Sequence, residues 1–224
     1  MGKIDNASNE RKTNRLEAFS DAVLAIAITL PVVELQSPTV KAGGNLAAAY
    51  AALWPEYVSY ALSCIVIGLY WVHSHFSGKI FKKTNHGFNL LTMLFLALVS
   101  ITPFPTRPFI EHLSDTANNR VAATVYSALL AAPAMVWFVR WQYAISQELL
   151  DPHLAASYLR RLTLKYAFTA VAAAAAPVIC WFVDWRLGIG LTAITILRYL
   201  MPPMTPQFKP GEEPADELQE ADDE

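Results

Sequence analysis

The first apolar stretch of the chain, residues 15–35, most constrains what this sequence can fold into. It is long enough to cross the hydrocarbon core of a bilayer as a helix, which takes about 20 residues. It nevertheless carries Arg15, Glu17 and Asp21 near its start, and charge at membrane depth is costly unless it faces protein or water. Asn14 and Glu17 have the spacing of a capping box, which predicts that the helix starts there. The sequence therefore predicts a membrane helix whose charged first turns face other protein groups or water.

One stripe of this helix is aliphatic and aromatic, with a single hydroxyl at its edge. Wound from Asn14, the helix places on that stripe Phe19, Ile26, Thr29, Leu30 and Val33. Two interpretations of the stripe stay open from the residues alone. It either packs against neighbouring helices in the ordinary way or faces an axis and lines a pore.

Composition and block length predict an all-α polytopic membrane protein. Only 16% of the 224 residues are charged, whereas a soluble domain carries about a quarter. The apolar residues fall into six blocks, which predict six transmembrane helices at roughly 16–35, 55–76, 88–105, 121–140, 162–183 and 186–201. Among these blocks there is no nucleophile–base pair, phosphate loop or cluster of metal ligands, and no basic patch of the nucleic-acid-binding type. An enzyme, a metal protein, a cofactor-dependent protein and a nucleic-acid-binding protein are therefore not expected.

The basic residues predict the orientation. Thirteen of the 17 lysines and arginines fall on the side of the membrane that holds the N-terminal segment, and four fall on the other. The positive-inside rule then places both termini in the cytoplasm. Eight of the 19 acidic residues follow Pro210, which predicts a disordered acidic tail. The expected organisation is a cytoplasmic segment at 1–14, a six-helix membrane domain at 15–201 and a cytoplasmic acidic tail at 202–224.

A motif in the first helix resembles that of a known family. Arg15, Phe19, Ser20 and Asp21, with Thr29 further along the helix, resemble the signature of the transmembrane protein 175 potassium channels, in the bacterial branch with six helices per subunit. The resemblance continues in three later segments of the first 110 residues, namely Tyr60–Ser63, Tyr70-Trp71 with the histidines that follow, and Pro103–Thr106.

The resemblance implies a potassium-selective channel in the cell membrane, built as a homotetramer whose first helices surround a central pore. Such channels lack a glycine-rich carbonyl filter, and this sequence has no loop of that kind. The implied pore constriction is formed by Ile26, Leu30 and Val33, and Thr29 contributes to selectivity. The implied partners are further copies of the chain, the lipid bilayer and permeating K⁺. A network that ties the first helix to the second and third would comprise Arg15, Phe19, Ser20, Asp21, Trp71, His73, His75 and Asn89.

Three points stay open from the residues. Pro31 interrupts the first helix close to Val33. His73 and His75 flank the place where the family has one histidine, and Asn89 competes with Thr92 for a family asparagine.

An alternative function is a proton-coupled secondary transporter. Membrane carboxylates often relay protons, and histidines titrate near neutral pH, so Asp21 with His73 or His75 would supply the coupling.

Overall fold

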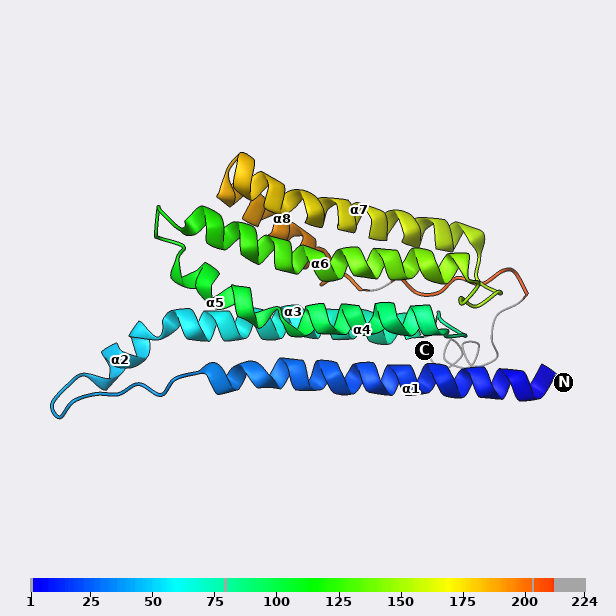
Figure 1. Ribbon diagram of the computed structural model, residues 1–224, viewed down its shortest axis with the longest axis horizontal. Helices are drawn as coiled ribbons and strands as arrows, with labels where there is room; N and C mark the ends of the chain where they lie inside the picture. The colour runs from blue at the N-terminus through cyan, green and yellow to red at the C-terminus, as the bar shows by residue number, and fades with distance from the viewer. Residues whose placement is uncertain (1, 79, 203, 212–224) are drawn as a thin grey trace.

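The protein is an elongated bundle of helices, described by a computed structural model over residues 2–78, 80–202 and 204–211 (Figure 1). In chain order the helices of this described part are α1 (Gly2–Thr29), the 3₁₀ helix η1 (Leu30–Glu34), α2 (Leu46–Ala52), α3 (Trp54–Gly78), α4 (His86–Ser100), α5 (Pro103–Glu111), α6 (Asn119–Ser146), α7 (Ala156–Phe182) and α8 (Trp185–Arg198). The expected all-α fold is confirmed.

Five helical segments of the described chain are long and apolar enough to cross a membrane. They are Thr13–Val33, Trp54–Phe76, His86–Glu111, Asn119–Ser146 and Ala156–Phe182. The first five apolar blocks of the sequence therefore form helices of spanning length. The sixth block forms α8, which has 14 residues and is about 21 Å long.

The start of α1 differs from the expectation. The helix begins at Gly2, so the prediction that Asn14 and Glu17 cap its start is wrong. No glycine or proline lies between Lys3 and Asn14, and nothing in that stretch interrupts the helical backbone. A polar stretch ahead of the apolar block is thus part of the same helix.

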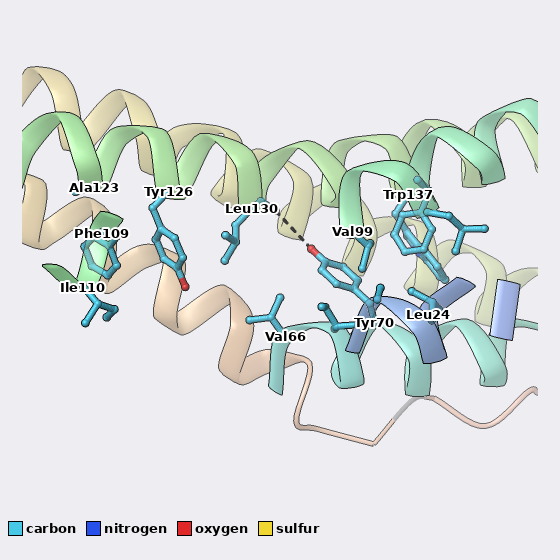
Figure 2. Close-up of a cluster of buried hydrophobic side chains, with 14 of the residues drawn as sticks. Leu24, Val66, Tyr70, Val99, Phe109, Ile110, Ala123, Tyr126, Leu130 and Trp137 are labelled. Atoms are coloured by element: carbon cyan, nitrogen blue, oxygen red, sulfur yellow. Dashed lines mark hydrogen bonds between the residues drawn. The ribbon is translucent and has the colours of Figure 1, made fainter. Parts of the chain in front are cut away.

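The helix α1 lies along one side of the bundle, where it packs against α3 and α4 (Figure 1). The other side consists of α6 and α7 with α8 against them. A cluster of buried side chains joins the two sides, and Figure 2 shows Leu24, Tyr70, Val99 and Trp137 within it. The Tyr70 hydroxyl donates a hydrogen bond to the Leu130 carbonyl oxygen at 3.4 Å, which links α3 to α6.

Three connecting segments meet at the end of the bundle where α7 begins. We call them the loop junction and define it as residues 80–83, 149–154 and 204–209. Isolated β-bridges pair Phe81 with Leu150 and Leu154 with Phe208. The backbone N–H of Asp151 also donates to the Ile80 carbonyl at 2.9 Å. The last described segment of the chain is therefore fixed to the same loops that precede α4 and α7.

Candidate pore helix and its anchoring network

The predicted stripe of α1 lies on the outer face of the subunit. Leu24 and Ala27 are buried against the rest of the bundle, with 1% and 4% of their surfaces exposed. Ile26, Leu30 and Val33 point the other way and are 57%, 59% and 79% exposed. Phe19 lies on the same outer face and is 49% exposed. The stripe therefore does not pack inside its own subunit.

The helical winding changes just before the predicted constriction ends. Residues 30–34 form the 3₁₀ helix η1, with Pro31 in its first turn, where a missing N–H costs little. A 3₁₀ helix has three residues per turn, so Leu30 and Val33 lie one above the other. Pro31 thus leaves Val33 on the exposed face. The Thr29 hydroxyl is within hydrogen-bond distance of the Ala25 and Ile26 carbonyls, at 3.1 and 3.0 Å.

At the other end of the apolar stretch, Asp21 fastens α1 to α3. Its Oδ1 accepts a hydrogen bond from the indole Nε1 of Trp71 at 3.1 Å. The Trp71 ring in turn stacks on His75, with ring centroids 5.9 Å apart. The Ser20 hydroxyl is used within its own helix, where it donates to the Leu16 carbonyl at 2.8 Å.

The two candidate histidines have different surroundings. His75 lies on the side of α3 that faces Asp21, and both line a cavity of about 200 Å³ that we call the inner cavity. His73 lies elsewhere: its Nε2 is 2.8 Å from the Tyr199 carbonyl oxygen, and its ring contacts the Tyr199 ring edge-on. The structure therefore brings His75, and not His73, together with the Asp21 motif.

The other members of the predicted network form a second group. Arg15, Phe19 and Asn89 line a hollow of about 560 Å³ between α1 and α4. The Asn89 Oδ1 is buried and has no hydrogen-bond partner in the described part of the chain. Thr92, the rival of Asn89, is buried, and its hydroxyl donates to the Phe88 carbonyl at 2.9 Å. Arg15 and Asp21 thus lie in separate environments.

Arg140 is not among the predicted site residues, yet the structure places it at the centre of the polar groups near α1. It lies within α6, is 4% exposed, and lines the inner cavity together with Glu17 and Asp21. Its guanidinium carbon lies 4.3–5.6 Å from the ring centroids of four aromatic residues, Phe81, Phe88, Phe95 and Trp137. Cation–π attraction of this kind stabilises a buried charge. The sequence signal that could have found it is a single charged residue inside the otherwise uncharged stretch 121–146.

The end of the α1–η1 segment is held by a partly buried ion pair. Glu56 of α3 is 7% exposed, and its Oε1 lies 3.1 Å from the Arg107 Nη2 of α5. The other oxygen of Glu56 accepts the backbone N–H of Gln36, just beyond η1, at 3.0 Å. Arg107 also bonds to Glu111 at 2.8 Å. Three elements are therefore joined where the chain leaves the proposed constriction.

No three His, Cys, Asp or Glu side chains gather at metal-binding distance within the described ranges. The polar groups near α1 fasten it to α3 and line the inner cavity, and the outer face of the helix is aliphatic. This arrangement suits a helix that guides ions or packs in an assembly.

Comparison with known proteins identifies the family. Residues 15–103 match the family model described as the endosomal/lysosomal potassium channel TMEM175. A potassium channel of Streptomyces collinus is 34% identical over 157 residues, which cover 70% of this chain and 76% of that protein. A potassium channel of Chamaesiphon minutus is 35% identical over 165 residues, 72% of this chain and 81% of that protein. The chicken endosomal/lysosomal proton channel TMEM175 is 28% identical, over 64% of this chain and 30% of that protein.

A solved structure agrees with these sequence matches. The crystal structure of a lysosomal potassium-selective channel TMEM175 homolog from Chamaesiphon minutus superposes with a TM-score of 0.71 at 30% identity, covering 85% of this chain and 97% of that one. The family is one of ion channels and not of enzymes. With its apolar helices and its Arg15–Asp21 motif, this chain belongs to the TMEM175 family of membrane ion channels.

Proposed function

We propose that the chain forms a homotetrameric potassium channel in which four copies of α1 surround the ion path. Ile26, Leu30 and Val33 form its narrow, aliphatic part, and the Thr29 hydroxyl contributes to selectivity. The observation that carries this proposal is the outward-facing stripe of α1. Only 22% of its spanning stretch is buried, against 33–44% in the other four spans.

A single helix cannot enclose an ion path, so the proposed function requires rotational assembly. The subunit surface offers places for a neighbouring copy. Beside the hollow of about 560 Å³ at Arg15 lies a second hollow of about 430 Å³, lined by Ile26, Leu30 and Phe104. Both run along the line between α1 and the α4–α5 segment, so side chains of an adjacent subunit can fill them.

The proposed gate works by wetting and drying. A tight ring of isoleucine side chains excludes water and blocks ions, and a slight widening lets the ring refill and conduct. Potassium gives up its hydration water more readily than sodium does, so a dry ring next to the hydroxyls of Thr29 favours potassium.

Replacing Thr29 by valine removes the hydroxyl at nearly constant shape. We expect Thr29→Val to reduce the preference for K⁺ over Na⁺ several-fold, seen as a shift of the reversal potential under bi-ionic conditions. Unchanged selectivity in a conducting variant contradicts the role given to Thr29.

The proposed membrane arrangement has six spans and cytoplasmic termini in the cell (plasma) membrane. The short helix α8 completes the set of spans, and the segment at 204–209 lies at the same end of the bundle as the start of α1 (Figure 1). The membrane domain is then 15–201, with cytoplasmic segments at 1–14 and 202–224. The tail beyond Gly211 lies outside the described residues.

Disulfide crosslinking tests the central axis. Oxidation of an Ile26→Cys variant in membranes should give covalent dimers on a non-reducing gel, because facing copies of residue 26 meet around the axis. The matched control is Val171→Cys on α7, a position that is 70% exposed but lies on the opposite side of the bundle. Crosslinking at residue 171, or the absence of crosslinking at residue 26, contradicts the proposal. The wild-type chain, with Cys64 and Cys180, provides the baseline.

One observation supports the alternative function, a proton-coupled transporter. Asp21 and His75 line the inner cavity together, as a proton relay would require. His73 takes no part in such a relay because it bonds to Tyr199. The Trp71 hydrogen bond gives Asp21 a structural role, and this favours the channel.

A further inference from the structure

Two cations lie close together where α8 ends. The Arg198 guanidinium lies over the ring of Phe168 on α7, 4.8 Å from its centroid. Lys165 lies one turn before Phe168 on α7, on the side of the helix that carries the ring beneath Arg198. Within the described residues, neither has a carboxylate within 4.0 Å. Two cations side by side in a membrane protein attract an anion.

Helix lengths place this pair at the edge of the hydrocarbon. A tight turn joins α7 to α8, so distances along both helices can be counted from that turn. Arg198 is the last residue of α8 and lies about 21 Å from the turn, and Lys165 lies about 26 Å from it. The hydrocarbon core is about 30 Å thick. With that turn placed at one boundary of the core, both charges come within about 10 Å of the other boundary, on the side of α1's start, and snorkelling brings them within reach of lipid phosphates.

The surroundings of the pair are apolar and exposed. On α7 and around the end of α8, four side chains are 57–61% exposed, namely Leu164, Phe168, Leu197 and Leu200. On the α3 side, His73 bonds to the Tyr199 carbonyl and adds no negative charge. Acyl chains can therefore cover the apolar side chains while a phosphate meets the cations.

We propose that Lys165 and Arg198 bind the phosphate of an anionic phospholipid from the leaflet on the side of α1's start. The arginine fork supplies two parallel hydrogen bonds to phosphate oxygens, and the lysine adds a point charge. A headgroup without its own cation suits the site best, because a choline group would bring a third positive charge close to the other two.

The test measures thermal unfolding of the full-length protein in a neutral detergent, with phosphatidylglycerol, phosphatidylcholine or inorganic phosphate added. We expect phosphatidylglycerol to raise the melting temperature by roughly 5 °C at saturation, because it binds the folded state alone. Phosphatidylcholine and inorganic phosphate should have little effect. An equal effect of inorganic phosphate would show that the site takes a free anion, and it would overturn the lipid assignment.

A charge-matched pair of variants gives the control. Lys165→Gln with Arg198→Gln should abolish the phosphatidylglycerol shift. Arg160→Gln with Arg186→Gln should retain it, since Arg160 is exposed on α7 and Arg186 lies over Trp185 at the opposite end of α8. If the first double variant does not fold, Arg198→Gln alone should raise the lipid concentration at half effect at least fivefold. An unchanged lipid response in these Lys165 and Arg198 variants overturns the proposal.

Discussion

Individual polar residues of α1 and α3 have separate tasks that their proximity in sequence does not reveal. Asp21 bonds across to Trp71, while Ser20 beside it bonds back to its own helix. His75 lies with Asp21, while His73, two residues earlier on the same helix, bonds to Tyr199. Successive residues of a helix point about 100° apart, so neighbours in a motif face different partners. The motif is therefore a set of separate contacts rather than a single site.

The substitution Ile26→Asn tests the gate at this scale. An asparagine amide at the proposed constriction attracts water into it and lowers the barrier to ion passage. We therefore expect several-fold faster K⁺ flux in liposomes. Ile65→Asn on α3 is the control, because Ile65 is similarly exposed at 53% but lies on another helix. Unaltered flux in a correctly assembled Ile26→Asn variant would show that residue 26 is not the gate.

Residue types and spacing predicted which face of α1 is apolar, but they did not predict the burial of charged groups. The stripe with Ile26 and Leu30 follows from helical periodicity. Arg140 is buried because the rings of Phe81 and Phe88, far from it in sequence, surround it together with Trp137 of its own helix. Glu56 is not among the predicted site residues, and the structure pairs it with Arg107. These partners are brought together by tertiary packing, so they cannot be predicted from the residues next to Arg140 or Glu56 in the sequence.

At the scale of elements, the close contact of α7 and α8 depends on a glycine. A methyl group on Gly188 would lie 2.3 Å from the Cys180 sulfur and 2.6 Å from the Ala176 carbonyl oxygen. The backbone of α7 cannot move aside to make room for this methyl group, as a flexible side chain could. The short helix α8 therefore sits directly against the backbone of α7.

We expect Gly188→Ala to destabilise the protein by about 1–3 kcal/mol, because the helices must move apart. Gly190→Ala is the matched control, since a methyl group there meets nothing within 4 Å. The control should stabilise by up to about 1 kcal/mol through helix propensity. Thermal unfolding of the two variants measures both effects, and equal melting temperatures would contradict the contact.

The loop junction depends on Asp151, which is buried between two loops. Burial raises the pKa of Asp151, but the backbone N–H and imidazole of His153 and the ammonium group of Lys82 outweigh it, so the pKa lies below the ordinary 3.8. Since the unfolded chain has the ordinary pKa, ionised Asp151 stabilises the fold above about pH 4. This stabilisation is lost as the pH falls through the folded-state pKa.

The substitution Asp151→Asn should therefore cost about 1–2 kcal/mol at pH 7. The cost should shrink as the pH falls below about 4, because the stabilisation by the ionised carboxyl is lost between the unfolded-state pKa and the lower folded-state pKa. Glu148→Gln, at an exposed position in the same loop, provides the control. Melting temperatures of the wild-type protein and the two variants, measured across this pH range, test the prediction. A difference between Asp151→Asn and the wild-type protein that does not change with pH contradicts it.

The lengths of the apolar blocks predicted five of the membrane helices. The residues at which these helices begin and end were predicted only in part. The prolines at 103 and 105 lie in α5, immediately after the chain breaks from α4, as proline chemistry predicts. The predicted start of α1 was wrong, because residues with the spacing of a capping box can also lie in the middle of a longer helix. The sixth block was predicted at 186–201, and its helix stops at Arg198, where the chain turns toward the loop junction.

At the scale of the whole molecule, α1 is a peripheral helix of its own subunit, and the proposed channel assigns it to the centre of the assembly (Figure 1). The inner cavity lies within one subunit, and the proposed channel has the aliphatic stripe shared among all copies. Ion passage and its rival, proton coupling, are thus assigned to different places. They also predict different behaviour in a sealed vesicle.

A passive channel moves charge, so net K⁺ efflux from liposomes builds up a voltage that halts it. We expect a protonophore, which dissipates that voltage, to accelerate efflux many-fold. The protein extracted in detergent should have four times the mass of the chain. Efflux that is already maximal without the protonophore and acidifies the vesicle interior would instead show electroneutral proton exchange.

The loop junction has a practical consequence for labelling. Gln207 accepts the N–H of Ala155, and Lys209 donates to the carbonyl of His153, so the chain up to Gly211 is clamped beside the base of α7. That clamp continues through Asp151 to the segment that leads into α4. A fluorescent reporter fused after Gly211 would therefore follow movements of the loop junction, whereas one fused ahead of Gly2 would follow the N-terminal end of α1.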